Sequence, residues 1–174
     1  DNTAVGHVAL TLNTTGSRNT AVGKGALSAN TGADNNVAVG YHALDLTTTG
    51  ASNVAVGAEA LEANTTGARN TAVGFQALHL STADDNVSIG NYALEQNTTG
   101  NKAVAVGSYA LDNNTTGSDN IGIGYHALGV NTTGGNNTAV GYKALEDNNG
   151  NDNTAVGKNA LTANTTGVNN VAVG

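Results

Sequence analysis

Few residues in this 174-residue chain are suited to chemistry: four histidines and thirteen acidic residues lie among Asn, Thr, Ala and Gly. His42 and His126 occupy the same position of the repeat described below, five repeats apart. If each repeat adds one strand spacing of about 4.8 Å, about 24 Å separates them, too far for one metal ion. Three copies of His126 would meet only if this position faced an axis shared by three chains. The sequence therefore predicts no metal site.

Acidic residues recur after the Ala-Leu pair of the repeat, but never in three successive repeats, and the G-G-x-G-x-D calcium motif is missing. We interpret this column as a solvated surface. The chain also lacks a phosphate-binding G-x-x-x-x-G-K-[S/T] loop and a G-x-S-x-G nucleophile motif. No cofactor and no enzymatic activity are expected. The acidic column comprises Asp45, Glu62, Glu95, Asp112 and Glu146.

Asn-Thr-Thr triplets have the form of N-glycosylation sequons. Their position in a repeated turn explains them without any sugar. They begin at Asn13, Asn64, Asn97, Asn114, Asn131 and Asn164.

A sequence repeat sets the positions of all these residues along the chain. The glycine that closes each A-V-G-like motif returns every 17 residues from Gly6 to Gly174, except for two steps of 16, Gly74 to Gly90 and Gly141 to Gly157. The unit is N-[T/V]-A-[V/I]-G-x-x-A-L-x-x-N-T-T-G-x-x. Residues 1–174 thus form one continuous array of units that stack on one another. Because both ends fall inside a unit, we expect the array to be part of a longer fibre protein.

Each unit predicts a short strand. Thr or Val, Ala, Val or Ile, and Gly alternate with period two, and β-branched residues share one side. The A-L pair forms a second short strand or a turn, and N-T-T-G closes the coil. Helices are excluded because each candidate is interrupted within about seven residues. We predict an all-β fold, a parallel β-solenoid (β-roll) of ten rungs of about 17 residues.

The small residues beside each Val suggest close packing. We expect the Val and Leu columns to fill the coil and the opposite Ala/Gly face to pack against identical chains, in a homotrimer. The alternative is a thin coil that covers this face with its own second segment. The Asn before each strand is expected to form a hydrogen-bonded ladder along the stack. The predicted inter-chain residues are Ala38, Gly40, Ala55 and Gly57.

The two positions after each of these glycines vary most and hold every aromatic residue. Aromatic side chains give large contact area at low entropic cost, and a rigid array multiplies weak contacts. Rings in successive rungs can equally stack on each other as part of the scaffold. The candidate partner-contact residues are Tyr41, His42, Phe75, Tyr92, Tyr109, Tyr125, His126 and Tyr142.

Charge and hydropathy limit the partners. The net charge is −7 and only six residues are Lys or Arg, which argues against nucleic acid and anionic membrane surfaces. The longest apolar run is too short to span a bilayer, so no membrane insertion is expected.

The N-[T/V]-A-[V/I]-G motif resembles the repeated strand of YadA-like heads in trimeric autotransporter adhesins, and the full unit is similar to tail-fibre-type repeats of bacteria and phage. The resemblance covers the whole chain. It implies a β-roll of three chains in an extracellular fibre, on a cell surface or a virion, and it supplies no catalytic residue.

The expected function is a structural and adhesive segment of such a fibre, attaching to host cells, prey cells or glycan surfaces. An ice-binding β-solenoid is the first alternative, because Thr-Thr pairs recur in register. A glycan-degrading fibre enzyme is the second. It would need two carboxylates roughly 5–9.5 Å apart, and the acidic pairs 84–85 and 146–147 suggest no cleft that would hold a sugar.

Overall fold

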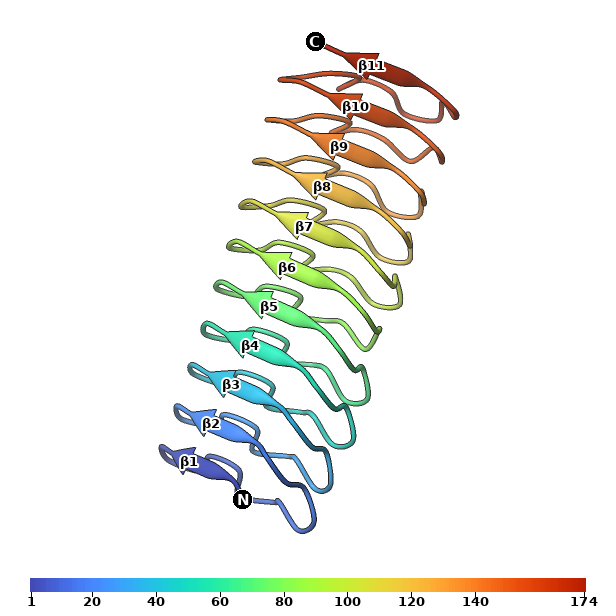
Figure 1. The fold of residues 1–174 in the computed structure, drawn as a ribbon. Helices are drawn as coiled ribbons and strands as arrows, with labels where there is room; N and C mark the ends of the chain where they lie inside the picture. Colours follow the sequence, from blue (N-terminus) through green and yellow to red (C-terminus); the bar gives the residue numbers. More distant parts are fainter.

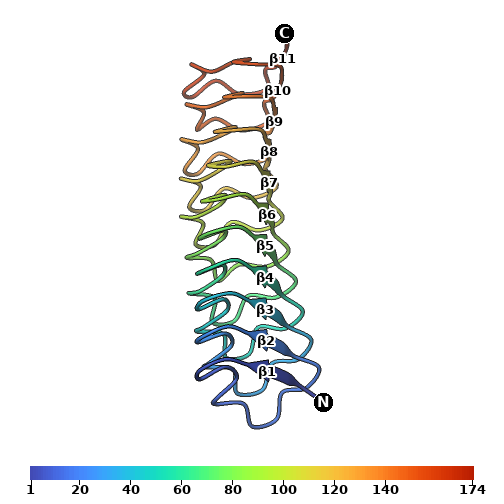
Figure 2. The ribbon, with the colours of Figure 1, turned by 90° about the vertical axis from the view of Figure 1, so that its left-hand side faces the viewer.

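The computed structural model describes all 174 residues as a single stack of coils without any helix (Figure 1). Each coil contributes one three-residue strand, and the eleven strands form one sheet in sequence order. The strands line one side of the stack, and the turns form the other (Figure 2). The strands are β1 (Thr3–Val5), β2 (Thr20–Val22), β3 (Val37–Val39), β4 (Val54–Val56), β5 (Thr71–Val73), β6 (Val87–Ile89), β7 (Val104–Val106), β8 (Ile121–Ile123), β9 (Thr138–Val140), β10 (Thr154–Val156) and β11 (Val171–Val173).

Every strand pairs in parallel with the next, and equivalent residues of the repeat are always partners, as Ala38 and Ala55 are. The register survives the two short steps, because Thr71 still pairs with Val87. Each of the two 16-residue steps lacks one residue of the N-T-T-G turn. The three-residue segments 81–83 and 148–150 take the place of that four-residue turn. The predicted all-β parallel solenoid is confirmed.

The Ala-Leu segment forms turns and no second strand. It still binds the neighbouring coil, since the Leu44 amide donates to the Ala60 carbonyl at 3.0 Å. Only 20 of the 112 backbone hydrogen bonds lie within the strands. Successive coils are therefore held together around most of their circumference.

Left-handed backbone conformations close each coil. His42, Leu44 and Ser52 have φ values of 51°, 52° and 62°, and their equivalents in the other coils match. β-Branched residues are strongly disfavoured in this region, which explains why the position of Leu44 holds Leu in every coil and never Val or Ile. The glycine after each strand has φ between 130° and 142°. A Cβ atom on Gly57 would collide with the carbonyl oxygen of Gly74 in the next coil.

The core consists of Ala and Leu, and the expectation for the Val and Ala faces is wrong. The central residue of each strand from β2 to β10 is buried and points into the coil, and Ala38 and Ala55 are completely buried within one chain. They cannot form the predicted contact between chains. Gly40 and Gly57 are small because the next coil of the same chain passes over them. The thin coil, covered by its own Ala-Leu segment, is therefore the correct alternative.

The interior has room for little more than a methyl group at the centre of each strand. A Cβ atom built on Gly122 would lie 3.0 Å from the Ala127 carbonyl oxygen and 3.2 Å from Leu111 Cδ1. Ser88 fits because its hydroxyl donates a 2.7 Å hydrogen bond to the Ala93 carbonyl. A Val side chain at this position would overfill the coil, so the Val residues face outwards.

The Asn ladder is present, although its bonds differ from simple amide stacking. Asn53 Nδ2 donates to the Gly67 carbonyl at 2.9 Å, and Asn53 Oδ1 accepts the backbone N–H of Asn70 at 2.9 Å. Each buried Asn thus links two parts of its coil and also the coil that follows. Ala103 interrupts the column, so no side-chain oxygen from that position faces the Asn120 amide.

The sequon asparagines form a second ladder. Asn114 Nδ2 donates to Asn97 Oδ1 at 3.0 Å, and Asn131 Nδ2 donates to Asn114 Oδ1 at 2.8 Å. Asn64 also belongs to this buried column. These amides hold the turns together inside the stack, in agreement with the structural interpretation of the triplets.

Candidate functional site

An uncharged, largely apolar surface covers the outer face of the sheet, which we call the Val/Thr face. It is formed by the first and third residues of β1 to β11, which point away from the buried Ala column. Of these 22 positions, 17 hold Val or Ile and five hold Thr, so the face carries no charge. Ile89 remains 42% exposed and Val56 37% exposed.

The size of this face is that of an apolar patch that commonly serves an interaction. Eleven strands at about 4.8 Å spacing and two side-chain columns give a strip on the order of 500 Å². The largest apolar patch on a typical monomer is about 300–600 Å² and often serves an interaction. The Val/Thr face is thus a candidate contact surface that the sequence interpretation missed, because it placed the Val column inside.

A continuous row of aromatic rings runs along the turns, formed by Phe75, Tyr92, Tyr109, Tyr125 and Tyr142, and we call it the aromatic stripe. Tyr92 and Tyr109 stack with ring centroids 5.1 Å apart, and Tyr125 and Tyr142 stack at 5.5 Å. Edge-to-face contacts join Phe75 to Tyr92 and Tyr109 to Tyr125. The expected stacking is present, so these rings contribute to the scaffold.

The stripe also stays accessible. Tyr125 and Tyr142 are each 45% exposed, and the ammonium groups of Lys143 and Lys158 lie 5.9 and 5.8 Å from the centre of the Tyr142 ring. His126 packs beside Tyr109 and Tyr125. Contact with a partner through the stripe remains a prediction.

Tyr41 and His42 lie apart from the stripe, although their own rings touch edge to face at 4.2 Å. The equivalent positions of the next coil hold Ala58 and Glu59, which interrupt the aromatic column. The structure therefore brings six of the eight predicted contact residues together and leaves these two separate.

The acidic column is not simply solvated. His126 Nδ1 is buried, has no hydrogen-bond partner and lies 3.5 Å from Glu146 Oε1. Asp112 Oδ1 is also buried without a partner, and burial raises the pKa of this carboxyl to about 6, against the opposing effect of His126. Nearer the N-terminal end of the stack, the His42 side chain lies close to Asp45 and Glu62 of the same column. The sequence interpretation missed these neighbours, which the 17-residue register places at separations of 17 and 20 residues.

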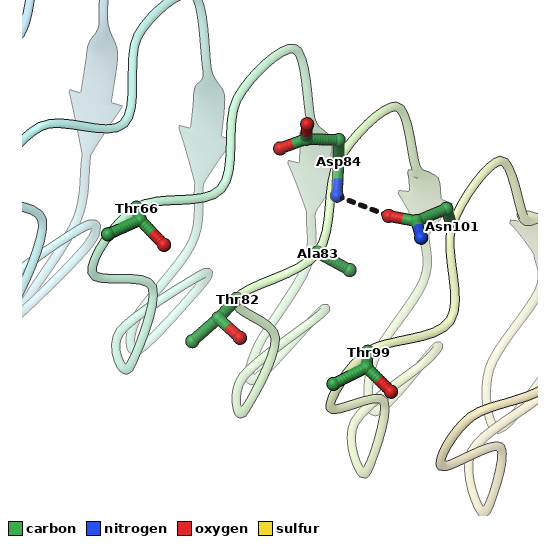
Figure 3. A pocket seen from close by; sticks show the side chains of 6 residues that line it. All are labelled: Thr66, Thr82, Ala83, Asp84, Thr99 and Asn101. Carbon is green, nitrogen blue, oxygen red and sulfur yellow. Dashed lines mark hydrogen bonds between the residues drawn. The ribbon is translucent and has the colours of Figure 1, made fainter.

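A hollow of about 390 Å³ marks the first shortened turn (Figure 3). Polar groups dominate its lining, and the Asp84 amide donates to Asn101 Oδ1 at 2.8 Å. Asp84 is its one acidic residue, and Arg69 pairs with that carboxylate at 3.2 Å. The hollow therefore lacks the second carboxylate that glycoside hydrolysis requires. It is lined by Thr66, Thr82, Ala83, Asp84, Thr99 and Asn101.

Comparison with protein-family models, with curated proteins and with solved structures gives no match for this chain. The structure contains no helix that is long and apolar enough to cross a membrane.

Proposed function

We propose that this array is a structural and adhesive segment of an extracellular fibre, on a cell surface or a virion, and that it acts without catalysis. Identical chains associate through the Val/Thr face, as a homotrimer. The aromatic stripe, on the turns, is left to contact a host cell, a prey cell or a glycan surface. The motif's resemblance to the heads of trimeric adhesins is consistent with this assembly.

The uncharged Val/Thr face is the observation that carries the proposal. All 19 charged side chains lie outside it. Water contact with so many β-branched side chains costs about 25 cal/mol for each Å² of apolar surface. Three such strips around an axis parallel to the stack would cover one another in a closed arrangement.

The mass of the protein in solution tests the assembly. We expect light scattering to give three times the chain mass for the native protein and the mass of one chain after Val106→Lys, which places a charge in the middle of the face. Thr65→Lys, in an exposed turn, is the matched control and should leave the trimer intact. A native protein that stays monomeric at high concentration would contradict the trimer.

Attachment is tested at the aromatic stripe by the double variant Tyr125→Ser and Tyr142→Ser. Binding to cells or to a glycan array is measured together with the melting temperature. Lost attachment at unchanged melting temperature supports adhesion through these rings. Retained attachment with a lower melting temperature would restrict them to the scaffold role that their stacking already indicates.

Ice binding remains the second candidate, and the in-register Val/Thr face favours it more than the Thr-Thr pairs do. In those pairs the first hydroxyl is used within the stack, as Thr48 Oγ1 donates to the Thr65 carbonyl at 3.1 Å. An ice-binding solenoid would keep the Val/Thr face open as a monomer and show thermal hysteresis. A trimer without thermal hysteresis would exclude this alternative.

A further inference from the structure

Three side chains from two neighbouring coils converge on one side of the stack. The ligand atoms of His42, Asp45 and Glu62 all lie within 4.8 Å of one another. Asp45 and Glu62 occupy the same repeat position, so the parallel register places them one coil apart. His42 lies three residues before Asp45, and the left-handed turn between them brings the imidazole against the Asp45 carboxylate.

We propose that His42, Asp45 and Glu62 bind one divalent transition-metal ion, with Zn²⁺ as the ion that their chemistry suits best. One imidazole nitrogen and two carboxylates are ligands that Zn²⁺ accepts in a tetrahedral site, with water in the fourth position. Calcium and magnesium prefer oxygen ligands throughout, so the imidazole selects against them.

Contacts around the three ligands favour binding. The Ser28 hydroxyl donates to Asp45 Oδ1, which fixes the carboxylate while its second oxygen faces His42. Such supporting hydrogen bonds orient metal ligands and raise affinity. Asp45 is almost fully buried, while the side chains of His42 and Glu62 are 26% and 29% exposed. An ion can thus enter from solvent onto ligands that are already held.

Charge around the site also favours a cation. Glu62 is shared with a second group, because the ligand atoms of Glu59, Glu62 and His79 likewise lie within 4.8 Å of one another. Glu62 Oε2 lies 3.7 Å from His79 Nδ1, beyond hydrogen-bond distance. Three carboxylates from Asp45, Glu59 and Glu62 therefore gather in two coils. In the second group, the Gln76 amide likewise donates to Glu59 at 2.6 Å. The first group is the better site because Asp45 is almost fully buried, whereas Glu59 is only half-buried.

The array provides its own control at His126, which holds the same repeat position as His42. Gly129 stands where Asp45 stands relative to His42, and the His126 ring fills the space of its missing side chain. In the next coil, Lys143 donates to Glu146 Oε1 at 2.9 Å and places a positive charge at that carboxylate. One ligand is absent here and another is neutralised, so His126 should not bind the ion.

The test is calorimetric titration of the native chain with Zn²⁺, followed by the same titration of His42→Gln, Glu62→Gln and His126→Gln. We expect one ion per chain, and a loss of affinity of about tenfold or more in the first two variants, as for the removal of groups that hold a metal. His126→Gln should titrate like the native chain. Circular dichroism establishes that each variant is folded, and the visible absorption of bound Co²⁺ reports a tetrahedral site in the native chain independently of any variant.

Four results would overturn the proposal. The native chain could take up no Zn²⁺ at micromolar to millimolar concentration, or His42→Gln could bind as tightly as the native chain. Alternatively, His79→Gln could abolish binding while His42→Gln preserves it, which would move the ion to the second group. Binding of Ca²⁺ alone, unaffected by His42→Gln, would likewise contradict a site built on an imidazole.

Discussion

Replacement of Ala55 by Leu tests which side of the sheet is the interior. Ala55 lies at the centre of β4, is completely buried and faces the Ala-Leu segment of its own chain. Leu would add three carbon atoms beyond the Cβ. Because these atoms have nowhere to go inside the coil, β4 and its turn must move apart, which stretches the hydrogen bonds to the coils on both sides.

The magnitude follows from the space beside the same column at Gly122, where even a Cβ atom would stand 3.0 Å from a carbonyl oxygen. Overpacking of a well-packed core typically costs 1–3 kcal/mol, and so narrow a coil should reach the upper end, about 3 kcal/mol. For a chain of this length that corresponds to a fall in melting temperature of about 6–12 °C.

The assay combines thermal unfolding, followed by circular dichroism, with amide hydrogen exchange. Exchange should accelerate mainly in β3 to β5, since each coil of a solenoid contacts only its neighbours. Thr65→Leu is the control, because Thr65 lies in an exposed turn outside the Val/Thr face and should change stability by less than about 0.5 kcal/mol. An Ala55→Leu protein that melts like the native one but loses its partner chains would refute this reasoning, since Ala55 would then face another chain.

Two further predictions concern buried polar groups. Asn53→Ala should lower the free energy of unfolding by about 2–3 kcal/mol, because it leaves the Gly67 carbonyl and the Asn70 amide without their partners. Ala103→Asn should raise it by about 1 kcal/mol by completing the ladder. Denaturant unfolding measures both variants, and equal effects of the same sign would contradict the ladder. Asp112→Asn should raise stability by about 1 kcal/mol at pH 8, because the variant avoids the cost of burying a charged carboxylate, which solvent partly screens. This gain should fade below pH 4. The sign follows because burial raises the folded pKa of Asp112 to about 6. The native carboxyl therefore favours folding below its unfolded pKa and loses that contribution as the pH rises through 6. A stability gain of the variant that is constant from pH 4 to pH 8 would contradict this prediction.

The sequence by itself determined the period, one short strand in each unit and the parallel register, and it left open whether the Ala-Leu pair forms a second strand or a turn. A 17-residue repeat with β-branched residues on alternate positions permits little else, because stacking is the only way such units can bury apolar surface. The Asn columns were also readable, since an amide recurring at the spacing of strands finds the same partners in every coil. The aromatic columns predicted ring stacking for the same reason.

Only the tertiary structure decided which face of each strand lies inside. Alternation assigns Ala to one face and Val to the other, but it does not say which is buried, and three residues are too few for hydrophobicity to choose. The width of the coil decides which face is buried. Left-handed turns at positions such as His42 and Leu44 set that width, because they bring the Ala-Leu segment so close to the strand that only a methyl group fits between them. The same turns bring His42 beside Asp45 and Glu62, because contacts across coils depend on the path of the backbone as well as on its period.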